Sequence, residues 1–209
     1  MSKELIQRCF DVKLETREEG DKGIIFGQPI VFNSRADLGC FDEIIEPSAL
    51  DMTDLSDVRL CLNHDTSYVY ARSRRNNPNS TMRLNRNASG LEIEAELALE
   101  ESPKARDYYS AITRGDIDKM SFMFSVGEDE WEDLDTDHPT RHITSISSVV
   151  EVSAVTFPAY DSTEIYARSK EALDNARLTL EKEQQQREQS LESDSKQLEL
   201  EKAKTLSLI

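Results

Sequence analysis

Two residues of the sequence combine a reactive side chain with a setting that suits catalysis. His64 lies in Asn63-His64-Asp65, where a run of alternating apolar residues ends in a turn, so its imidazole should lie near a surface edge. Ser121 is a small hydroxyl within the bulky run Met-Ser-Phe-Met-Phe of residues 120–124. A serine hydroxyl is a weak nucleophile at neutral pH unless a neighbouring base takes its proton. His64 and Ser121 are therefore a candidate general base and nucleophile, and the structural alternative is that both are ordinary polar residues.

Glu151 is the candidate third member of the site. A carboxylate within the apolar run 149–155 costs on the order of several kcal/mol of desolvation unless it is paired. Accepting a hydrogen bond from His64 would pair it, fix the imidazole tautomer and stabilise the imidazolium that forms when Ser121 loses its proton. The alternative is that Glu151 lies on a solvated face or pairs with an arginine such as Arg141.

The other two histidines, His138 and His142, are four residues apart, a spacing that binds zinc when it lies on a helix. Pro139 and the β-branched residues after it argue against a helix, so we expect no metal site and no cofactor. His142 precedes Glu151 in the same strand region and remains the alternative residue for orienting His64. A metal-assisted hydrolase that uses His64, His138 and His142 is the weakest hypothesis for the chemistry.

The segments that must position these residues mostly alternate apolar and polar residues with period two, which is typical of half-buried strands. Residues 58–62 lead to His64, and residues 82–84 and 91–97 flank the turn signal 87–90 as a hairpin. Residues 147–157 are apolar on both faces except for Glu151 and Ser153, which predicts a central strand. The pattern predicts a mainly β (α+β) fold, an antiparallel closed or partly open β-barrel with a few flanking helices.

One helix is predicted between the hairpin and Ser121. Ser102 can cap it, Pro103 suits its first turn and Gly115 follows as a stop, with an apolar stripe of Ala105, Tyr108, Tyr109 and Ile112. A shorter helix is expected near Pro47. The acidic cluster 128–137, which surrounds Trp131, is expected to be a solvated loop.

Composition divides the chain of 209 residues into a domain, residues 1–167, and a tail, residues 168–209. The tail has no aromatic residue, glycine or proline, and its leucines fit no sustained heptad. A free helix of this kind is marginal in water, so we expect a charged helical or partly disordered tail, or one that docks on a partner.

The charge and the cysteines restrict the partners and the compartment. Lys and Arg number 25 against 41 Asp and Glu, a formal charge of -16 that repels phosphate backbones, so no nucleic-acid partner is expected. Cys9, Cys40 and Cys61 are odd in number and lack CxxC spacing, which favours a reducing cytosol over a disulfide framework. The start of the chain lacks an apolar signal region, and no apolar run is long enough to span a bilayer, so we expect no membrane contact and no secretion.

The order of several short motifs resembles the phage prohead proteases of the serine type, a family regarded as distantly similar in fold to the herpesvirus capsid-assembly proteases. The resemblance covers roughly residues 6–167. Its most telling pieces are 27–34, 41–50, 57–65 with the Asn-His-Asp block, 120–124 with the Met-Ser-Phe block, 151–153 and 155–160. The chain departs from the family by carrying Lys119 and Met123 where glycines are usual, and Tyr70-Ala-Arg72 where Leu-Gly-Arg is common.

The resemblance implies that His64 and Ser121 are the catalytic pair, that Glu151 is the third member, and that the barrel is herpesvirus-protease-like. It implies a serine endopeptidase that cleaves scaffold, coat-protein propeptides and itself during prohead maturation, inside the immature capsid in the host cytoplasm. Scaffold and major coat protein would be its substrates, and self-association is open because the herpesvirus relatives are activated by dimerisation. The alternative is a noncatalytic capsid-assembly protein, a protease-like barrel that binds scaffold.

Overall fold

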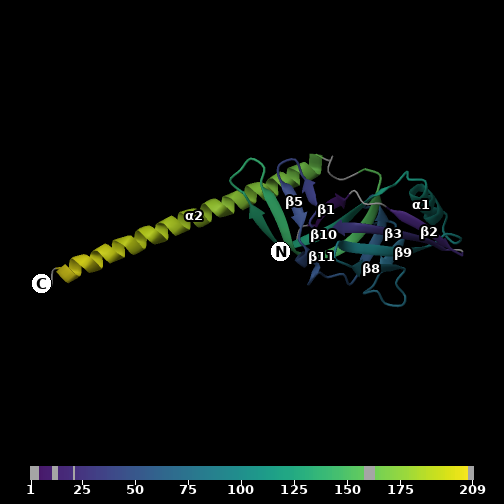
Figure 1. Ribbon diagram of the computed structural model, residues 1–209, viewed down its shortest axis with the longest axis horizontal. Helices are drawn as coiled ribbons and strands as arrows, with labels where there is room; N and C mark the ends of the chain where they lie inside the picture. Colours follow the sequence, from purple (N-terminus) through teal and green to yellow (C-terminus); the bar gives the residue numbers. More distant parts are fainter. Residues whose placement is uncertain (1–4, 11–13, 21, 158–162, 207–209) are drawn as a thin grey trace.

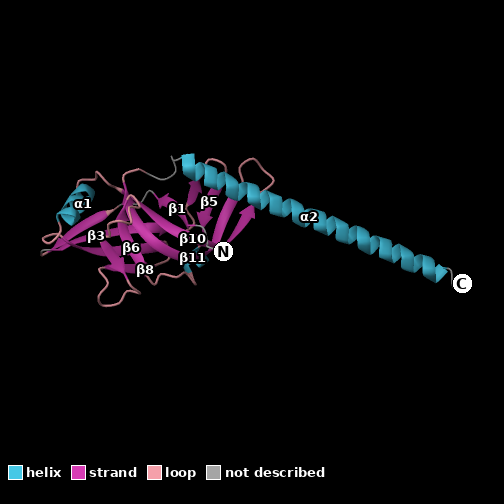
Figure 2. Cartoon of the chain, turned by 180° about the vertical axis from the view of Figure 1, so that it is seen from behind, coloured by secondary structure: helices cyan, strands magenta, loops and turns pink. Residues whose placement is uncertain are grey.

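The computed structural model describes residues 5–10, 14–20, 22–157 and 163–206. The described strands form a seven-stranded and a four-stranded sheet, and a long C-terminal helix projects away from them (Figure 1). Seen from behind, the strands gather at one end of the molecule, and α2 begins beside them and extends away toward the other end (Figure 2). The predicted mainly β fold is therefore confirmed.

The seven-stranded sheet contains Ser121 and Glu151, and one of its strands leads to His64. Its strands run in the order β1, β10, β11, β5 and β4, and β11 also pairs with β6, which pairs with β7. The bounds are β1 Leu5–Phe10, β4 Arg35–Asp37, β5 Asp42–Ile45, β6 Val58–Leu62, β7 Ala71–Ser73, β10 Lys119–Glu132 and β11 Thr140–Val155. The pairing of β11 with β10, β6 and β5 confirms the prediction that the apolar run around Glu151 is central in its sheet.

The four-stranded sheet runs in the order β2, β3, β9 and β8. Its strands are β2 Glu15–Glu19, β3 Lys22–Val31, β8 Met82–Arg86 and β9 Gly90–Ala98. The antiparallel pairing of β8 with β9 confirms the predicted hairpin. Among the described strands no pairing joins the two sheets, so the closed barrel is not confirmed.

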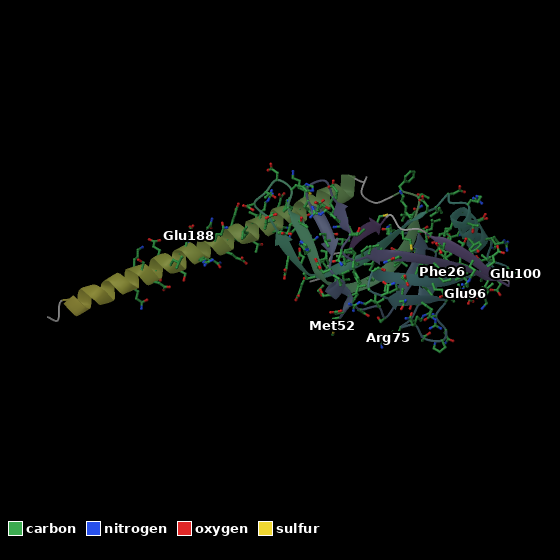
Figure 3. All side chains as sticks on the ribbon, in the orientation of Figure 1. Phe26, Met52, Arg75, Glu96, Glu100 and Glu188 are labelled. Atoms are coloured by element: carbon green, nitrogen blue, oxygen red, sulfur yellow. The ribbon has the colours of Figure 1, made fainter. Side chains whose placement is uncertain are left out.

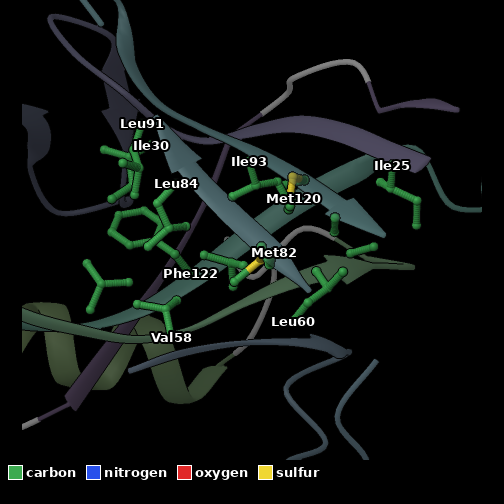
Figure 4. Packing of buried hydrophobic residues seen from close by; sticks show 14 of the residues in the cluster. Ile25, Ile30, Val58, Leu60, Met82, Leu84, Leu91, Ile93, Met120 and Phe122 are labelled. Carbon is green, nitrogen blue, oxygen red and sulfur yellow. The ribbon is translucent and has the colours of Figure 1, made fainter. Parts of the chain in front are cut away.

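The main core lies between the two sheets and explains why β10 places Ser121 as it does. Met120, Phe122 and Phe124 are fully buried in this core, where they meet apolar side chains of β3, β8 and β9 (Figure 4). Successive side chains of a strand point to opposite faces. Ser121 and Ser125 therefore point to the face of the sheet that lies away from this core.

The predicted helix is α1, Pro103–Thr113. The Ser102 hydroxyl accepts a hydrogen bond from the Ala105 amide, Pro103 stands in the first turn, and the four residues of the predicted stripe are buried. Gly115 has a φ of 78°, a left-handed conformation that glycine adopts without strain. The short helix near Pro47 is the 3₁₀ turn η1, Pro47–Leu50.

The tail is a single helix, α2 Thr163–Leu206, and it crosses the expected boundary at residue 167. Its first part packs on the domain: Leu173 is buried beside Leu38 and Phe41, and the Arg177 guanidinium donates to two loop carbonyls, those of Leu134 and Thr136. Beyond this contact the side chains through residue 197 are exposed, as for Glu188 in Figure 3.

Part of the acidic cluster is strand rather than loop. Residues 128–132 belong to β10 and pair with residues 140–145 of β11, so the expectation of a solvated loop is wrong for this half. Trp131 packs edge-on against Phe41, with ring centroids 4.8 Å apart, and this contact gives the acidic segment an apolar anchor. No helix among the described residues is long and apolar enough to span a membrane.

Candidate active site

His64 is held in an unusual backbone conformation just beyond β6. Asn63 and His64 have φ angles of 51° and 61°, a left-handed region that non-glycine residues seldom occupy. The Asn63 amide donates to the Ala154 carbonyl at 3.0 Å, and the Asn63 side-chain oxygen accepts from the Thr156 amide at 2.9 Å. These bonds attach the turn to the end of β11, and one of them uses the side chain of Asn63.

Glu151 lies against the ring of His64, and its Oε2 is 2.7 Å from His64 Nδ1. The carboxylate is almost fully buried, with a side-chain exposure of 2%, and the exposure of the histidine side chain is 14%. The parallel pairing of β11 with β6 brings them together, because Ala154 lies opposite Leu62, the last residue of β6. The alternative partner Arg141 contacts Glu43 and Asp129 instead.

The other ring nitrogen of His64 is free for chemistry. His64 Nε2 is buried and has no hydrogen-bond partner among the described residues. A buried polar atom without a partner is costly, and in a folded protein it calls for an explanation. With Nδ1 held by a carboxylate, Nε2 is the atom that can accept a proton.

Ser121 lies across β11 from the strand that leads to His64, and among the described residues no hydrogen bond joins it to the His64–Glu151 pair. It lies opposite Ser153 in the β10–β11 ladder and opposite Cys9 in the β1–β10 ladder. Its side chain is fully buried, and its hydroxyl donates to the Arg8 carbonyl at 2.8 Å. The hydroxyl must leave this acceptor before it can donate to Nε2.

Ser153 completes a hydrogen-bonded ring that the sequence analysis did not assign to the site. Its hydroxyl donates to Glu151 Oε1 and accepts from the backbone amide of His64 at 3.0 Å. Together with the bond between Nδ1 and Oε2, this closes a ring through the three residues. The available signal was a serine two positions from the buried acid, on the same face of the same strand.

The charge of Glu151 also acts on Cys61, which lies opposite Ser153 on β6. Burial raises the pKa of the Cys61 thiol to about 12, and the negative charge of Glu151 adds to the shift. Burial also raises the pKa of Tyr108, whose hydroxyl donates to the Cys61 carbonyl at 3.1 Å. Both groups therefore stay neutral near pH 7, and neither competes with His64 as a base.

The remaining histidines lie in other contacts. His142 Nδ1 is 2.7 Å from Glu46, and its Nε2 is 3.4 Å from Glu132. The structure thus places Glu151, and not His142, against His64. His142 is on the strand β11, so the helical zinc spacing does not arise.

His138 is the member of a separate cluster. Its Nε2 is 3.2 Å from Asp42 and 3.9 Å from Asp37, so these three side chains could in principle hold a cation. The Arg35 guanidinium lies 2.8 Å from the other oxygen of Asp42 and already supplies positive charge there. Both carboxylate oxygens of Asp42 therefore have partners, one in Arg35 and the other in His138.

Two family departures can be placed. Lys119 begins β10, and Met123 lies opposite Glu151 in the β10–β11 ladder, on the same face as Ser121. Arg72 of the Tyr-Ala-Arg segment makes two hydrogen bonds of 2.6 Å to Asp57, just before β6. This arginine joins β7 to the start of β6, the strand that leads to His64. Residues 158–160 of the last matching motif lie outside the described residues.

Comparison with known proteins identifies the family of the chain. Residues 10–177 match the family model described as caudovirus prohead serine protease, which covers most of the chain and all three candidate catalytic residues. No curated protein and no solved structure matches the chain.

Proposed function

Because the chain belongs to the caudovirus prohead serine protease family, we propose that it is a serine endopeptidase that cleaves scaffold, coat-protein propeptides and itself during capsid maturation. The observation that carries this proposal is the buried His64–Glu151 pair, whose second ring nitrogen has no partner among the described residues, with Ser121 on the strand that pairs with the strand of Glu151. A base, an orienting acid and a nucleophile are the parts that acyl transfer needs.

The reaction starts when the Ser121 hydroxyl turns from the Arg8 carbonyl toward His64 Nε2. Catalytic hydrogen bonds are often long or misaligned without substrate and tighten when it binds. Ser121 Oγ attacks the scissile carbonyl carbon while its proton passes to Nε2. His64 returns that proton to the leaving amine, and a water molecule then hydrolyses the acyl-enzyme with the same base.

Glu151 supports each of these proton transfers. It holds the proton of His64 on Nδ1, so that Nε2 carries the lone pair before attack, and its charge stabilises the imidazolium after attack. The burial of the carboxylate strengthens this effect, because water screens the interaction less.

The proposed site of action is the interior of the immature capsid in the host cytoplasm, and the proposed substrates are scaffold and major coat protein. Membership of a prohead protease family supports this assignment. The formal charge of -16 suits an enzyme that should not bind DNA. Self-association stays part of the proposal, with no described contact to define its surface.

The exposed part of α2 is proposed as a tail that binds coat or scaffold, or that self-cleavage removes. The packing of Leu173 and Arg177 argues that a truncation should keep these residues. A chain ending at Thr179 should assemble into proheads less well than the full chain when both are co-produced with coat and scaffold. Equal incorporation would exclude a tether.

The hydrogen bond from Ser121 to the Arg8 carbonyl favours a second candidate function, that of a noncatalytic assembly protein. The hydroxyl is fully buried and bonded to a backbone carbonyl, an arrangement that also suits a purely structural serine. In that case the parent protein itself should process nothing.

The test is the intact mass of coat, scaffold and protease after co-assembly with the parent chain or with Ser121→Ala. The proposal expects discrete cleavage products with the parent and a loss of about 10³-fold or more in rate with Ser121→Ala. Ser125→Ala, a buried serine on the same face of β10, is the matched control and should process normally. Normal processing by Ser121→Ala would refute the protease, and no processing by the parent would support the assembly protein.

A further inference from the structure

The hydroxyl of Ser153 forms hydrogen bonds with the two residues proposed as base and acid. A serine hydroxyl has one donor hydrogen and can accept through its lone pairs. Ser153 donates its hydrogen to Glu151 Oε1 and accepts from the His64 backbone amide. No other hydrogen bond to this hydroxyl occurs among the described residues.

The bond to Glu151 matters because the carboxylate is out of contact with water. Each of its oxygens needs a donor, since an unsatisfied buried acceptor is costly, and more so when it is charged. Nδ1 of His64 supplies one donor and Ser153 supplies the other. Without Ser153 the carboxylate would rotate toward another donor, and Glu151 Oε2 would lose its alignment with His64 Nδ1.

The bond to the His64 amide acts on the backbone. His64 has a φ of 61°, a strained conformation that persists only where its surroundings impose it. Ser153 gives the amide of this strained residue its acceptor. The same hydroxyl thus holds the main chain of the base and, through Glu151, the ring of the base.

We propose that Ser153 is a positioning residue of the acyl-transfer site, which aims His64 Nε2 by fixing both the left-handed backbone of His64 and the carboxylate of Glu151. This inference rests on the proposed protease function. Ser153 is assigned to positioning because its hydroxyl bonds the acid that holds Nδ1 of His64 and also the backbone amide of His64 itself. It acts through His64, and not through substrate.

The first experiment separates kcat from KM for processing of the co-assembled substrate. Ser153→Ala should lower kcat about 10- to 100-fold and change KM less than about 3-fold, because the residue touches the base and not the substrate. Ser153→Thr keeps the hydroxyl and should recover most of the lost kcat. An unchanged kcat in Ser153→Ala, or a loss confined to KM, would overturn the proposal.

A double-mutant cycle then tests whether Ser153 acts through Glu151. Adding Ser153→Ala to Glu151→Gln should reduce kcat by a smaller factor than Ser153→Ala does in the parent, because the carboxylate that Ser153 holds is already gone and only its bond to the His64 amide remains to be lost. A structural role elsewhere would reduce kcat by the same factor in both backgrounds, and that result would contradict the proposal.

A spectroscopic readout covers the case in which a variant loses activity by misfolding. In the folded Ser121→Ala protein, the strongly hydrogen-bonded Nδ1 proton of His64 should give a far-downfield proton NMR signal, assigned by its loss in His64→Ala. Adding Ser153→Ala should move or broaden this signal while the rest of the spectrum stays folded. A signal that stays in place would overturn the proposal.

The two levels of failure are distinguishable. If Ser121→Ala still processes substrate, the protease function itself fails. If Ser121→Ala is inactive but Ser153→Ala matches the parent and the Ser125→Ala control in kcat, only the role of Ser153 fails.

Discussion

Two histidine–carboxylate pairs in the same sheet have the same closest distance, 2.7 Å, but different chemical capacity. In the His142–Glu46 pair both ring nitrogens face carboxylates, and the two side chains are 25% and 30% exposed. In the His64–Glu151 pair the exposures are 14% and 2%, and Nε2 has no partner in the part of the chain that the structure describes. The two pairs differ in burial and in the contacts of the second ring nitrogen, and these differences, rather than the distance to an acid, are the reason that His64 and not His142 is proposed as the base.

The largest expected difference is between alanine substitutions of the two histidines. His64→Ala should lower the rate of processing about 10⁴-fold, because Ser121 then has no base to take its proton. His142→Ala should change the rate less than about 3-fold, since His142 lies in surface ion pairs. Rates of substrate cleavage in co-assembled proheads measure both, and similar losses in the two variants would remove the distinction between the pairs.

The acids should differ in the same direction by a smaller factor. Glu151→Gln should lower kcat about 10³-fold, because an amide neither fixes the tautomer of His64 nor stabilises the imidazolium. Glu46→Gln, matched in chemistry and in distance to its histidine, should leave kcat within about 3-fold. Equal effects in single-turnover assays would show that Glu151 does not support the base.

Burial should also determine how much an acid outside the proposed active site contributes to the free energy of unfolding. Glu43 forms a buried ion pair with Arg8, and their side-chain exposures are 2% and 6%. Glu43→Gln should reduce the free energy of unfolding by about 3 kcal/mol, because it leaves a buried guanidinium uncompensated. Glu132→Gln, at the exposed partner of His142, should cost less than about 1 kcal/mol. Urea unfolding of the three proteins checks this, and a Glu43→Gln variant as stable as the parent would contradict it.

The smallest predicted effect is a pH dependence from Cys61, next to the buried pair. Its folded pKa of about 12 lies above its ordinary value of 9.0, so between these pH values the unfolded chain loses the thiol proton while the folded chain keeps it. The stabilisation is fully present below about pH 9 and falls as the pH rises, by at most about 1.4 kcal/mol per pH unit. Urea unfolding from pH 8 to 10 should therefore be less pH-dependent for Cys61→Ala than for the parent. Identical slopes would exclude this effect.

Much of the local structure was predictable because it depends on nearby residues. The alternation of Met120, Phe122 and Phe124 predicts which face of β10 enters the core, and Ser102 and Gly115 predict the ends of α1. The need of a buried Glu151 for a partner likewise follows from elementary desolvation.

Other features depend on pairing between distant segments, which periodicity does not encode. Whether strands close into a barrel is decided by ladders such as β11 with β6, and the described ladders form two sheets. The bond from Ser121 to the Arg8 carbonyl joins residues 113 positions apart, and no local pattern indicates it. Ser153 was visible only as a polar interruption of an apolar run, and its role depends on the turn of Asn63 and His64.

The most direct test of the central claim is the site and rate of covalent labelling by a serine-directed phosphonylating probe, read by peptide mapping. With Ser121 as nucleophile and His64 as base, we expect the parent protein to be labelled at Ser121. His64→Ala should reduce the labelling rate at least about 100-fold, and His142→Ala should leave it unchanged. Labelling at Ser153 in place of Ser121, or equal rates for the parent and His64→Ala, would contradict it.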